Sequence, residues 1–321
     1  MKPAPTVTAT DPALAVTVAG IPFAVPVLAA PGPLGFGREV QSVVDLRAYG
    51  GFITKSLTLE PREGHPRPDL VEVEGGWLNA LGLPNPGLAG FVHRDLPFLR
   101  TLGLPIIVSI AGHTIEEFQQ IVEVLDDEEG GAAIELNVSC PNVRVGRLFG
   151  SDPSLTAGLV TALRRMTRRP LFVKLGPLVT DITAIAKAAA DAGADALCCV
   201  NTLPGLAIDV ESRRPLLGAG PGGLSGPALR PLAVWSTWRV ARATPLPVIG
   251  AGGVRTARDA LEFLLAGARA VAVASAAITD PEAPQQIVAG LRDYLRRHGL
   301  ADIGAVIGHV DGLEGVEVDG A

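Results

Sequence analysis

The 321-residue chain carries 27 basic and 33 acidic residues, for a formal net charge of −6, and 48% of its residues are hydrophobic. This acidic balance argues against a protein that binds nucleic acid through clustered positive charge. The longest uncharged stretch, residues 12–37, is broken by glycine and proline, so we expect no membrane span. Three cysteines without paired metal-binding spacing, and an amino terminus without a secretion signal, predict a cytoplasmic protein with no metal site.

Short apolar runs then alternate with longer segments of helical period, which is the pattern of βαβ units. Before the first of them, LAVTVAGIPFAV predicts a β-hairpin that turns at Ala19 and Gly20 and closes the bottom of a barrel. Thr180 and Asp181 predict the start of one helix and Gly193 its end. The apolar runs predict eight barrel strands, near residues 24–29, 51–55, 105–110, 132–137, 170–175, 195–200, 246–250 and 270–274.

We therefore expect an α/β protein with a single (β/α)8 TIM barrel over residues 1–308 and a loose tail over residues 309–321. Two connections are long, residues 56–104 and 201–226, and both follow predicted strands on the carboxyl side. Active sites of TIM barrels lie at that end.

Two scarce residue types gather at the predicted strand ends. The chain has only four lysines, Lys55 and Lys174 among them, and only five asparagines, of which Asn137 and Asn201 follow strands. A lone asparagine in such a position is usually a turn former. Because the carboxyl ends of barrel strands share one mouth, the convergence instead predicts a polar site there.

The segment NVSCPN contains Cys140 in a predicted loop, whereas Cys198 and Cys199 lie in a predicted strand and are expected to fill the core. A loop thiol can act as a base or as a nucleophile. A nucleophilic cysteine needs a partner histidine, and the five histidines show no familiar spacing. We therefore expect Cys140 to be reactive, and at this point a base, a nucleophile and an inert loop thiol all stay open.

Glycines close the last two predicted strands. VIGAGGV ends strand seven with Gly252 and Gly253, and AVAVASA ends strand eight with Ala274 and Ser275. In TIM barrels these two loops commonly bind a phosphate through backbone amides. Glycine is also common in the turns that follow strands, so the motif by itself identifies no nucleotide.

Taken in order, TKSLTLEPREGHP, GGWLNALGLPNPG, ELNVSCPNV, FVKLGP, VNTLPG, GGLSGPALRP and GAGGV resemble the dihydroorotate dehydrogenases over roughly residues 12–308. Cysteine at position 140, where the membrane-bound branch has serine, and the following RLFGSDP are similar to the soluble NAD-linked branch. The resemblance implies FMN-dependent oxidation of dihydroorotate to orotate in pyrimidine biosynthesis, with Cys140 as the base.

The resemblance also implies the binding residues. Those expected to hold the substrate are Lys55, Asn79, Ala80, Leu81, Gly82, Leu83, Asn137, Asn142, Asn201 and Thr202. Those expected to hold FMN are Pro31, Lys55, Ser56, Ser109, Asn137, Lys174, Val200, Gly226, Gly252, Gly253, Ala274 and Ser275. The sequence departs from the family pattern in three places: Pro31 replaces serine, Ser109 replaces asparagine, and the pair Ala274 and Ser275 replaces glycine and threonine.

Several alternatives stay open at this point. A dihydropyrimidine dehydrogenase-like flavoenzyme has a similar barrel and cysteine loop, and a flavin-free barrel could bind a phosphorylated ligand without redox chemistry. The resemblance implies a homodimer and a possible second subunit with FAD and an iron-sulfur cluster. The final electron acceptor, NAD through that subunit or fumarate directly, is not determined by the sequence.

Overall fold

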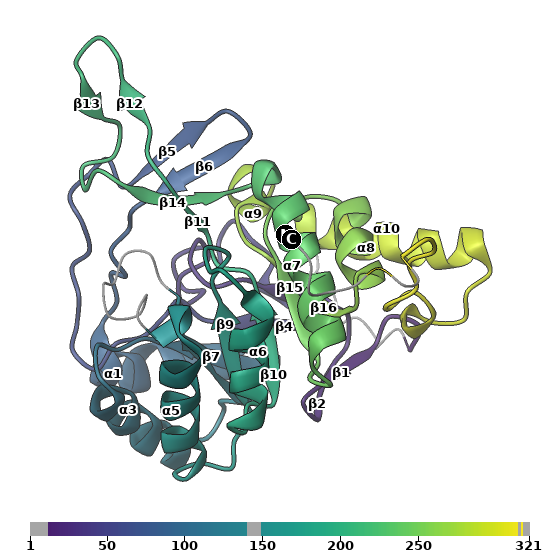
Figure 1. Ribbon diagram of the computed structural model, residues 1–321, viewed down its shortest axis with the longest axis horizontal. Coiled ribbons are helices and arrows are strands. Elements are labelled where there is room, and N and C mark those ends of the chain that lie inside the picture. Colours follow the sequence, from purple (N-terminus) through teal and green to yellow (C-terminus); the bar gives the residue numbers. More distant parts are fainter. Residues whose placement is uncertain (1–11, 140–148, 314–315, 317–321) are drawn as a thin grey trace.

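The protein is described by a computed structural model that covers residues 12–139, 149–313 and 316 (Figure 1). Eight parallel strands close into a barrel in the order β10-β15-β16-β3-β4-β7-β8-β9. This confirms the predicted TIM barrel. The barrel strands are β3 (Val27–Ala29), β4 (Gly51–Ile53), β7 (Ile106–Ile110), β8 (Ala133–Asn137), β9 (Leu171–Leu175), β10 (Ala196–Cys199), β15 (Val248–Ala251) and β16 (Ala268–Val273).

Helices surround the barrel (Figure 1). The longer ones are α3 (Ile115–Asp127), α5 (Pro153–Arg164), α6 (Ile182–Asp191), α7 (Arg230–Ala243), α8 (Ala257–Leu265) and α10 (Ala283–His298). Asp181 caps α6 by accepting from the Thr183 N–H, and Gly193 follows the helix with a φ of 101°, as the sequence predicts. The barrel strands are almost wholly buried because apolar side chains pack on both of their faces.

Shorter helical segments occupy the connections. They are α1 (Gly87–Gly90), the π-helix η2 (Phe91–Asp95), α2 (Leu96–Arg100) and α9 (Ala276–Thr279), with 3-10 turns at η1 (Leu46–Ala48), η3 (Pro227–Leu229) and η4 (Ile303–Ala305). None of the helices in the described part of the chain is both long enough and apolar enough to cross a membrane. Residues 314–315 and 317–321 are not described, so the predicted tail and its boundary at residue 308 stay predictions.

The predicted amino-terminal hairpin is confirmed. Strands β1 (Val16–Val18) and β2 (Ile21–Phe23) pair antiparallel around a turn in which Ala19 and Gly20 both have positive φ. The buried Phe23 ring lies so close to Gly51, the first residue of β4, that a Cβ there would be 2.6 Å from a ring carbon. The hairpin therefore closes the amino-terminal end of the barrel.

The two long connections, expected as loops, join in a second sheet. Strands β5 (Leu70–Val73), β6 (Gly76–Asn79), β11 (Leu203–Gly205) and β14 (Gly222–Ser225) form an antiparallel sheet in the order β11-β14-β6-β5. Between β11 and β14, the short strands β12 (Ile208–Asp209) and β13 (Arg214–Pro215) form a hairpin that projects at the top of Figure 1. The strands are only three or four residues long, and β6, β11 and β14 contain glycine, so the sequence pattern does not distinguish them clearly from loops.

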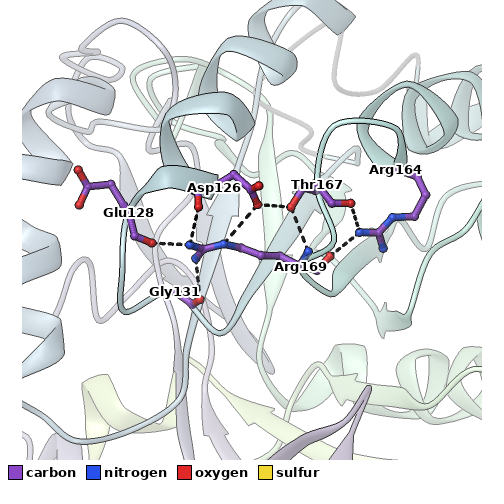
Figure 2. A network of polar contacts seen from close by, with 6 residues as sticks. All are labelled: Asp126, Glu128, Gly131, Arg164, Thr167 and Arg169. Atoms are coloured by element: carbon purple, nitrogen blue, oxygen red, sulfur yellow. Dashed lines mark hydrogen bonds and ion pairs between the residues drawn. The ribbon is translucent and has the colours of Figure 1, made fainter.

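A polar network ties together the loops that lead into β8 and β9 (Figure 2). The Arg169 guanidinium donates to the carbonyl oxygens of Gly131 at 2.7 Å and Asp126 at 3.1 Å. Thr167 donates its hydroxyl to the Asp126 carboxylate and accepts from the Arg169 backbone N–H. These bonds fix the amino-terminal ends of two strands whose carboxyl ends reach the cavity described next.

Candidate active site

A cavity of about 410 Å³ lies at the carboxyl ends of the barrel strands, between the barrel and the small sheet. Its volume is within the range of ~300–1,000 Å³ that is usual for small-molecule sites. The sequence-predicted residues that line it are Pro31, Lys55, Ser56, Asn79, Leu81, Leu83, Asn137, Lys174, Asn201, Thr202, Ala274 and Ser275. The structure thus brings together side chains from seven separate segments of the chain.

The floor of the cavity is made by strand ends. Asn137 is the last residue of β8 and lies opposite Lys174 in the pairing of β8 with β9. Asn201 follows β10. All three are less than 10% exposed. A buried ammonium group needs a negative or electron-rich partner, so Lys174 fits a cavity that receives an electron-rich ring or an anion.

The amides on this floor are joined by hydrogen bonds. Asn201 donates through Nδ2 to Asn137 Oδ1 at 3.1 Å, and Asn137 donates through Nδ2 to Ser56 Oγ at 2.8 Å. Asn201 Oδ1 accepts from the Thr202 backbone N–H at 2.8 Å. The side chains are therefore held in fixed orientations before any ligand arrives.

Lys55 follows β4 and forms part of the cavity wall. Burial lowers the pKa of its ammonium group below the ordinary 10.5, and the negative charges of Glu39 and Asp69 partly oppose that shift. Because water solvates this charge poorly, a ligand with negative charge or carbonyl oxygens would be attracted to it.

The three glycines predicted to bind a phosphate do not themselves line the cavity. Gly226, Gly252 and Gly253 all have φ values between 77° and 128°, which side-chain-bearing residues rarely adopt. A Cβ on Gly253 would lie 2.7 Å from the Gly226 carbonyl oxygen, so these two backbones approach each other closely. Ala274 and Ser275, which precede α9, line the neighbouring wall. The segment fits backbone recognition of a phosphate.

Some predicted residues lie behind the cavity surface instead of on it. Ala80 and Val200 are buried, with Ala80 N–H bonded to the Asp69 carbonyl and Val200 N–H to the Ala251 carbonyl. Gly82 is also buried, next to the His65 ring. Ser109 is wholly buried, and its hydroxyl contacts Ser56 at 3.0 Å and Glu135 at 2.9 Å. Cys140 and Asn142 lie outside the described residues.

Asn85, the one asparagine that was given no role in the site, has a structural one. Its side chain accepts from the backbone N–H groups of Thr58 and Gly87 and donates to the Leu83 carbonyl at 2.8 Å. These bonds join two parts of the long connection after β4. They hold the segment that carries Asn79 and Leu83 toward the cavity.

Other residues that were not predicted from the sequence also line the cavity: Gly32, Pro33, Leu70, Trp77, Ser225 and Ile278. Trp77 could have been found, because it is one of only three tryptophans and lies in GGWLNALGLPNPG. The buried Glu135 was also missed, since a single carboxylate within a strand carries no motif.

A larger cavity of about 550 Å³ lies near the opposite end of the barrel, beside the hairpin and the loops before β15 and β16. It contains Arg242, Arg269 and Trp238 but none of the predicted site residues. In TIM barrels the amino-terminal face serves stability, whereas catalysis takes place at the other face. The smaller cavity is therefore the candidate active site.

Comparisons with known proteins find relatives of this chain. Residues 13–295 match the family model described as dihydroorotate dehydrogenase. A protein of Geotalea daltonii is 48% identical over 298 residues, 92% of this chain and 98% of that protein. One of Desulforudis audaxviator is 50% identical over 295 residues, 92% and 96% of the two chains. Both are named dihydroorotate dehydrogenase B (NAD(+)), catalytic subunit.

The fold is also similar to a solved structure. The crystal structure of the dihydroorotate dehydrogenase of Eimeria tenella in complex with ferulenol superimposes with a TM-score of 0.77. The sequences are 22% identical, and the match covers 95% of this chain and 90% of that one. At this identity the likeness concerns the fold.

Proposed function

The chain belongs to the dihydroorotate dehydrogenase family, and on that premise we propose that it oxidises dihydroorotate to orotate in the 410 Å³ cavity, with FMN as its cofactor. Enzymes of this family are FMN-dependent oxidoreductases of pyrimidine biosynthesis. The observation that carries the proposal is the convergence of Lys55, Lys174, Asn79, Asn137 and Asn201 on one cavity, from a chain with only four lysines and five asparagines.

The residues of the cavity fit FMN. Lys174, which is buried and lines the cavity, suits a ring that gains electron density on reduction, and the close-packed glycines Gly226 and Gly253, which lie outside its lining, suit a phosphate. When bound, FMN supplies the acceptor for the hydride that leaves the substrate. Pro31 has no backbone N–H and the Ser109 hydroxyl is engaged with Ser56 and Glu135, so these two family contacts are weakened or absent here.

For the substrate, side-chain amides suit an imide edge because they both donate and accept. Asn79, Asn137 and Asn201 provide such amides, and the Lys55 ammonium provides a charge for the carboxylate. Cys140 is the proposed base. Its thiolate takes the proton from one ring carbon, the hydride leaves the neighbouring carbon, and a double bond forms between the two.

The names of the relatives support a partner. Because they are called catalytic subunits of an NAD(+)-linked enzyme, we propose that electrons pass from FMN to NAD through a second subunit with FAD and an iron-sulfur cluster. A homodimer of barrels and a cytoplasmic location complete the proposal. Copurification of an iron-sulfur flavoprotein with the chain would support the partner, and direct fumarate reduction by the isolated chain would contradict it.

The activity is tested by anaerobic addition of dihydroorotate to the purified, FMN-loaded protein. Flavin absorbance should bleach in the wild type, while in Cys140→Ala the flavin stays bound and its reduction slows by a factor of about 10²–10⁴, the usual contribution of a general base. Cys199→Ala, which removes a wholly buried thiol, is the matched control. If the wild type binds no flavin, or its flavin is not reduced by dihydroorotate, the proposed function is wrong. If the flavin of Cys140→Ala is reduced as fast as that of the wild type, only the role of Cys140 as base is wrong.

A further inference from the structure

We propose that Arg255, in the loop after β15, binds the phosphate group of FMN and gives the site a preference for FMN over riboflavin, which lacks that group. The inference rests on the proposed function, because it takes FMN as the cofactor. It concerns a side chain that does not line the active-site cavity.

Arg255 lines a second cavity, of about 260 Å³, which we call the side cavity. Trp77 and Ser275 line both this cavity and the active-site cavity. The two cavities therefore lie next to each other and share part of their walls. The end of a long ligand bound in the active-site cavity would reach the side cavity at Ser275.

The side cavity lies at the end of the site where a phosphate is expected. In TIM barrels the loops after the last two strands, here β15 and β16, commonly bind phosphate. A Cβ on Gly253 would lie 2.7 Å from the Gly226 carbonyl oxygen, and a Cβ on Gly226 would lie 2.7 Å from the Gly76 Cα. Gly76 and Pro227 line the side cavity. The predicted phosphate-binding glycines and the side cavity are thus in direct contact.

The backbone of Arg255 is fixed, whereas its guanidinium is available. Its N–H donates to Asp259 Oδ2 at 2.9 Å, and Asp259 forms a capping box with Thr256 at the start of α8. The neighbouring Arg230 pairs with both Asp259 and Glu262. By contrast, the side chain of Arg255 has no ion pair or hydrogen bond within the described part of the chain.

Glu72 is a possible competitor for this guanidinium, because it also lines the side cavity. No ion pair joins Glu72 to Arg255 among the residues that the structure describes. Glu72 is exposed and lies on β5, an edge strand of the small sheet. Water therefore screens its charge, and the positive charge of Arg255 is not neutralised by a contact.

A guanidinium suits this end of the cofactor. A phosphate monoester carries a charge of about −1.5 to −2 at pH 7. Backbone N–H groups offer it only partial charges, whereas an arginine offers a full charge and two parallel hydrogen bonds. The two cations of the active-site cavity are assigned to other groups, Lys174 to the flavin ring and Lys55 to the substrate carboxylate. Arg255 supplies a charge for the phosphate.

The contribution of Arg255 should be modest, because the residue is exposed. Exposed ion pairs are weak, whereas a bidentate pair of arginine with phosphate is stronger than most. We therefore expect the loss of the guanidinium to raise the Kd for FMN roughly 5- to 10-fold. Riboflavin has no phosphate, so its Kd should not change.

The test is fluorescence titration of the FMN-free protein with FMN and, separately, with riboflavin. The wild type and Arg255→Met are compared. The Kd of the variant should rise for FMN alone, and the difference from the wild type should shrink with salt, because the screening length falls from about 10 Å at 0.1 M to about 3 Å at 1 M. Arg255→Lys keeps the charge without the planar fork, so its Kd for FMN should lie between the two.

Arg258→Met is the matched control. It removes the same charge three residues further along, from an exposed position on α8 that lines neither cavity. Its Kd for FMN should equal that of the wild type.

Two results would overturn the inference. One is an unchanged Kd for FMN in Arg255→Met, and the other is an equal rise for FMN and riboflavin, which would mean that the substitution only disturbs the loop. If Arg255→Met does not fold, Arg255→Lys decides by the same comparison of the two flavins. A wild type that binds neither flavin would instead refute the proposed function.

Discussion

The two sides of the cavity are built differently. The floor, formed by Ser56, Asn137, Lys174 and Asn201, consists of strand ends in a closed barrel and is almost completely buried. The cover, formed by the small sheet with Leu70, Trp77, Asn79 and Ser225, consists of short strands from two long connections, and most of its residues are half-buried.

We expect the floor to be rigid and the cover to be more adaptable. In a closed barrel each strand is hydrogen-bonded on both sides, so groups at its end are held to within a fraction of an ångström of one arrangement. The small sheet has two edge strands, β5 and β11, and little apolar core of its own. We therefore expect charge stabilisation to depend on the floor, and substrate retention to depend on the cover.

The largest effect that would test this comparison is expected on the floor. Lys174→Met removes a buried cation next to the proposed flavin, and a hydrogen bond to a charged group contributes ~1.5–3 kcal/mol, so FMN affinity should fall roughly 10- to 100-fold. Fluorescence titration of the FMN-free protein measures the change. Lys187→Met, on the exposed side of α6, is the control. Equal FMN affinity in the two variants would mean that the floor does not bind the cofactor.

A smaller effect is expected on the cover. Trp77→Ala removes an aromatic wall of the cavity and should weaken orotate binding about 5- to 10-fold, mainly by faster dissociation, because an aromatic contact contributes roughly 0.5–1.5 kcal/mol beyond its buried area. Stopped-flow displacement of orotate measures the rate. Trp235→Ala, on the outer surface of α7, is the control. If Trp77→Ala lost FMN as strongly as Lys174→Met, the division into floor and cover would fail.

The smallest effect concerns Lys55, which lies between the two regions. Its pKa is lower in the folded protein than the ordinary 10.5, so between those values the unfolded chain binds more protons. The contribution of Lys55 to stability therefore rises as pH increases through that window. The buried cysteine thiols and Tyr49, whose pKa values are raised by burial, oppose this trend, so the difference between wild type and a variant is the quantity to measure.

In the FMN-free protein, the free energy of unfolding should rise more steeply with alkaline pH in the wild type than in Lys55→Met. The gap between the two curves should widen as pH rises toward 10.5. Denaturant unfolding at several pH values between 8 and 10 measures the gap. If the free energy of unfolding changed with pH in the same way in both proteins, the Lys55 ammonium would be well solvated. This position would then belong to the open side of the cavity.

Much of the fold could be predicted from local patterns. The eight barrel strands were found within about three residues of their ends, since short apolar runs bounded by glycine, proline or charge mark buried parallel strands. The hairpin turn at Ala19 and Gly20 and the cap at Asp181 were also predicted from local chemistry.

The site was predicted less completely, for a physical reason. Scarce residues and motifs pointed to Lys55, Asn137 and Lys174, but nothing in the sequence distinguished Ser109, which lies behind the cavity, from a residue on its surface. Whether a strand residue contacts a ligand or its neighbours depends on side-chain length and on what the adjacent strands present. Ser109 is short, and Ser56 and Glu135 take up its hydrogen bonds.

The sequence by itself determined which segments form barrel strands and which uncommon side chains they carry, because periodicity, turn residues and composition act over a few residues of chain. Only the tertiary structure decided that β6 pairs with β14, so that Asn79 donates to the Gly223 carbonyl 144 residues away. It also decided that the Ser109 hydroxyl hydrogen-bonds with both Ser56 and Glu135, which come from neighbouring parts of the barrel. Such pairings form only when closure of the barrel brings together segments that are far apart in the sequence. Local sequence patterns cannot predict them.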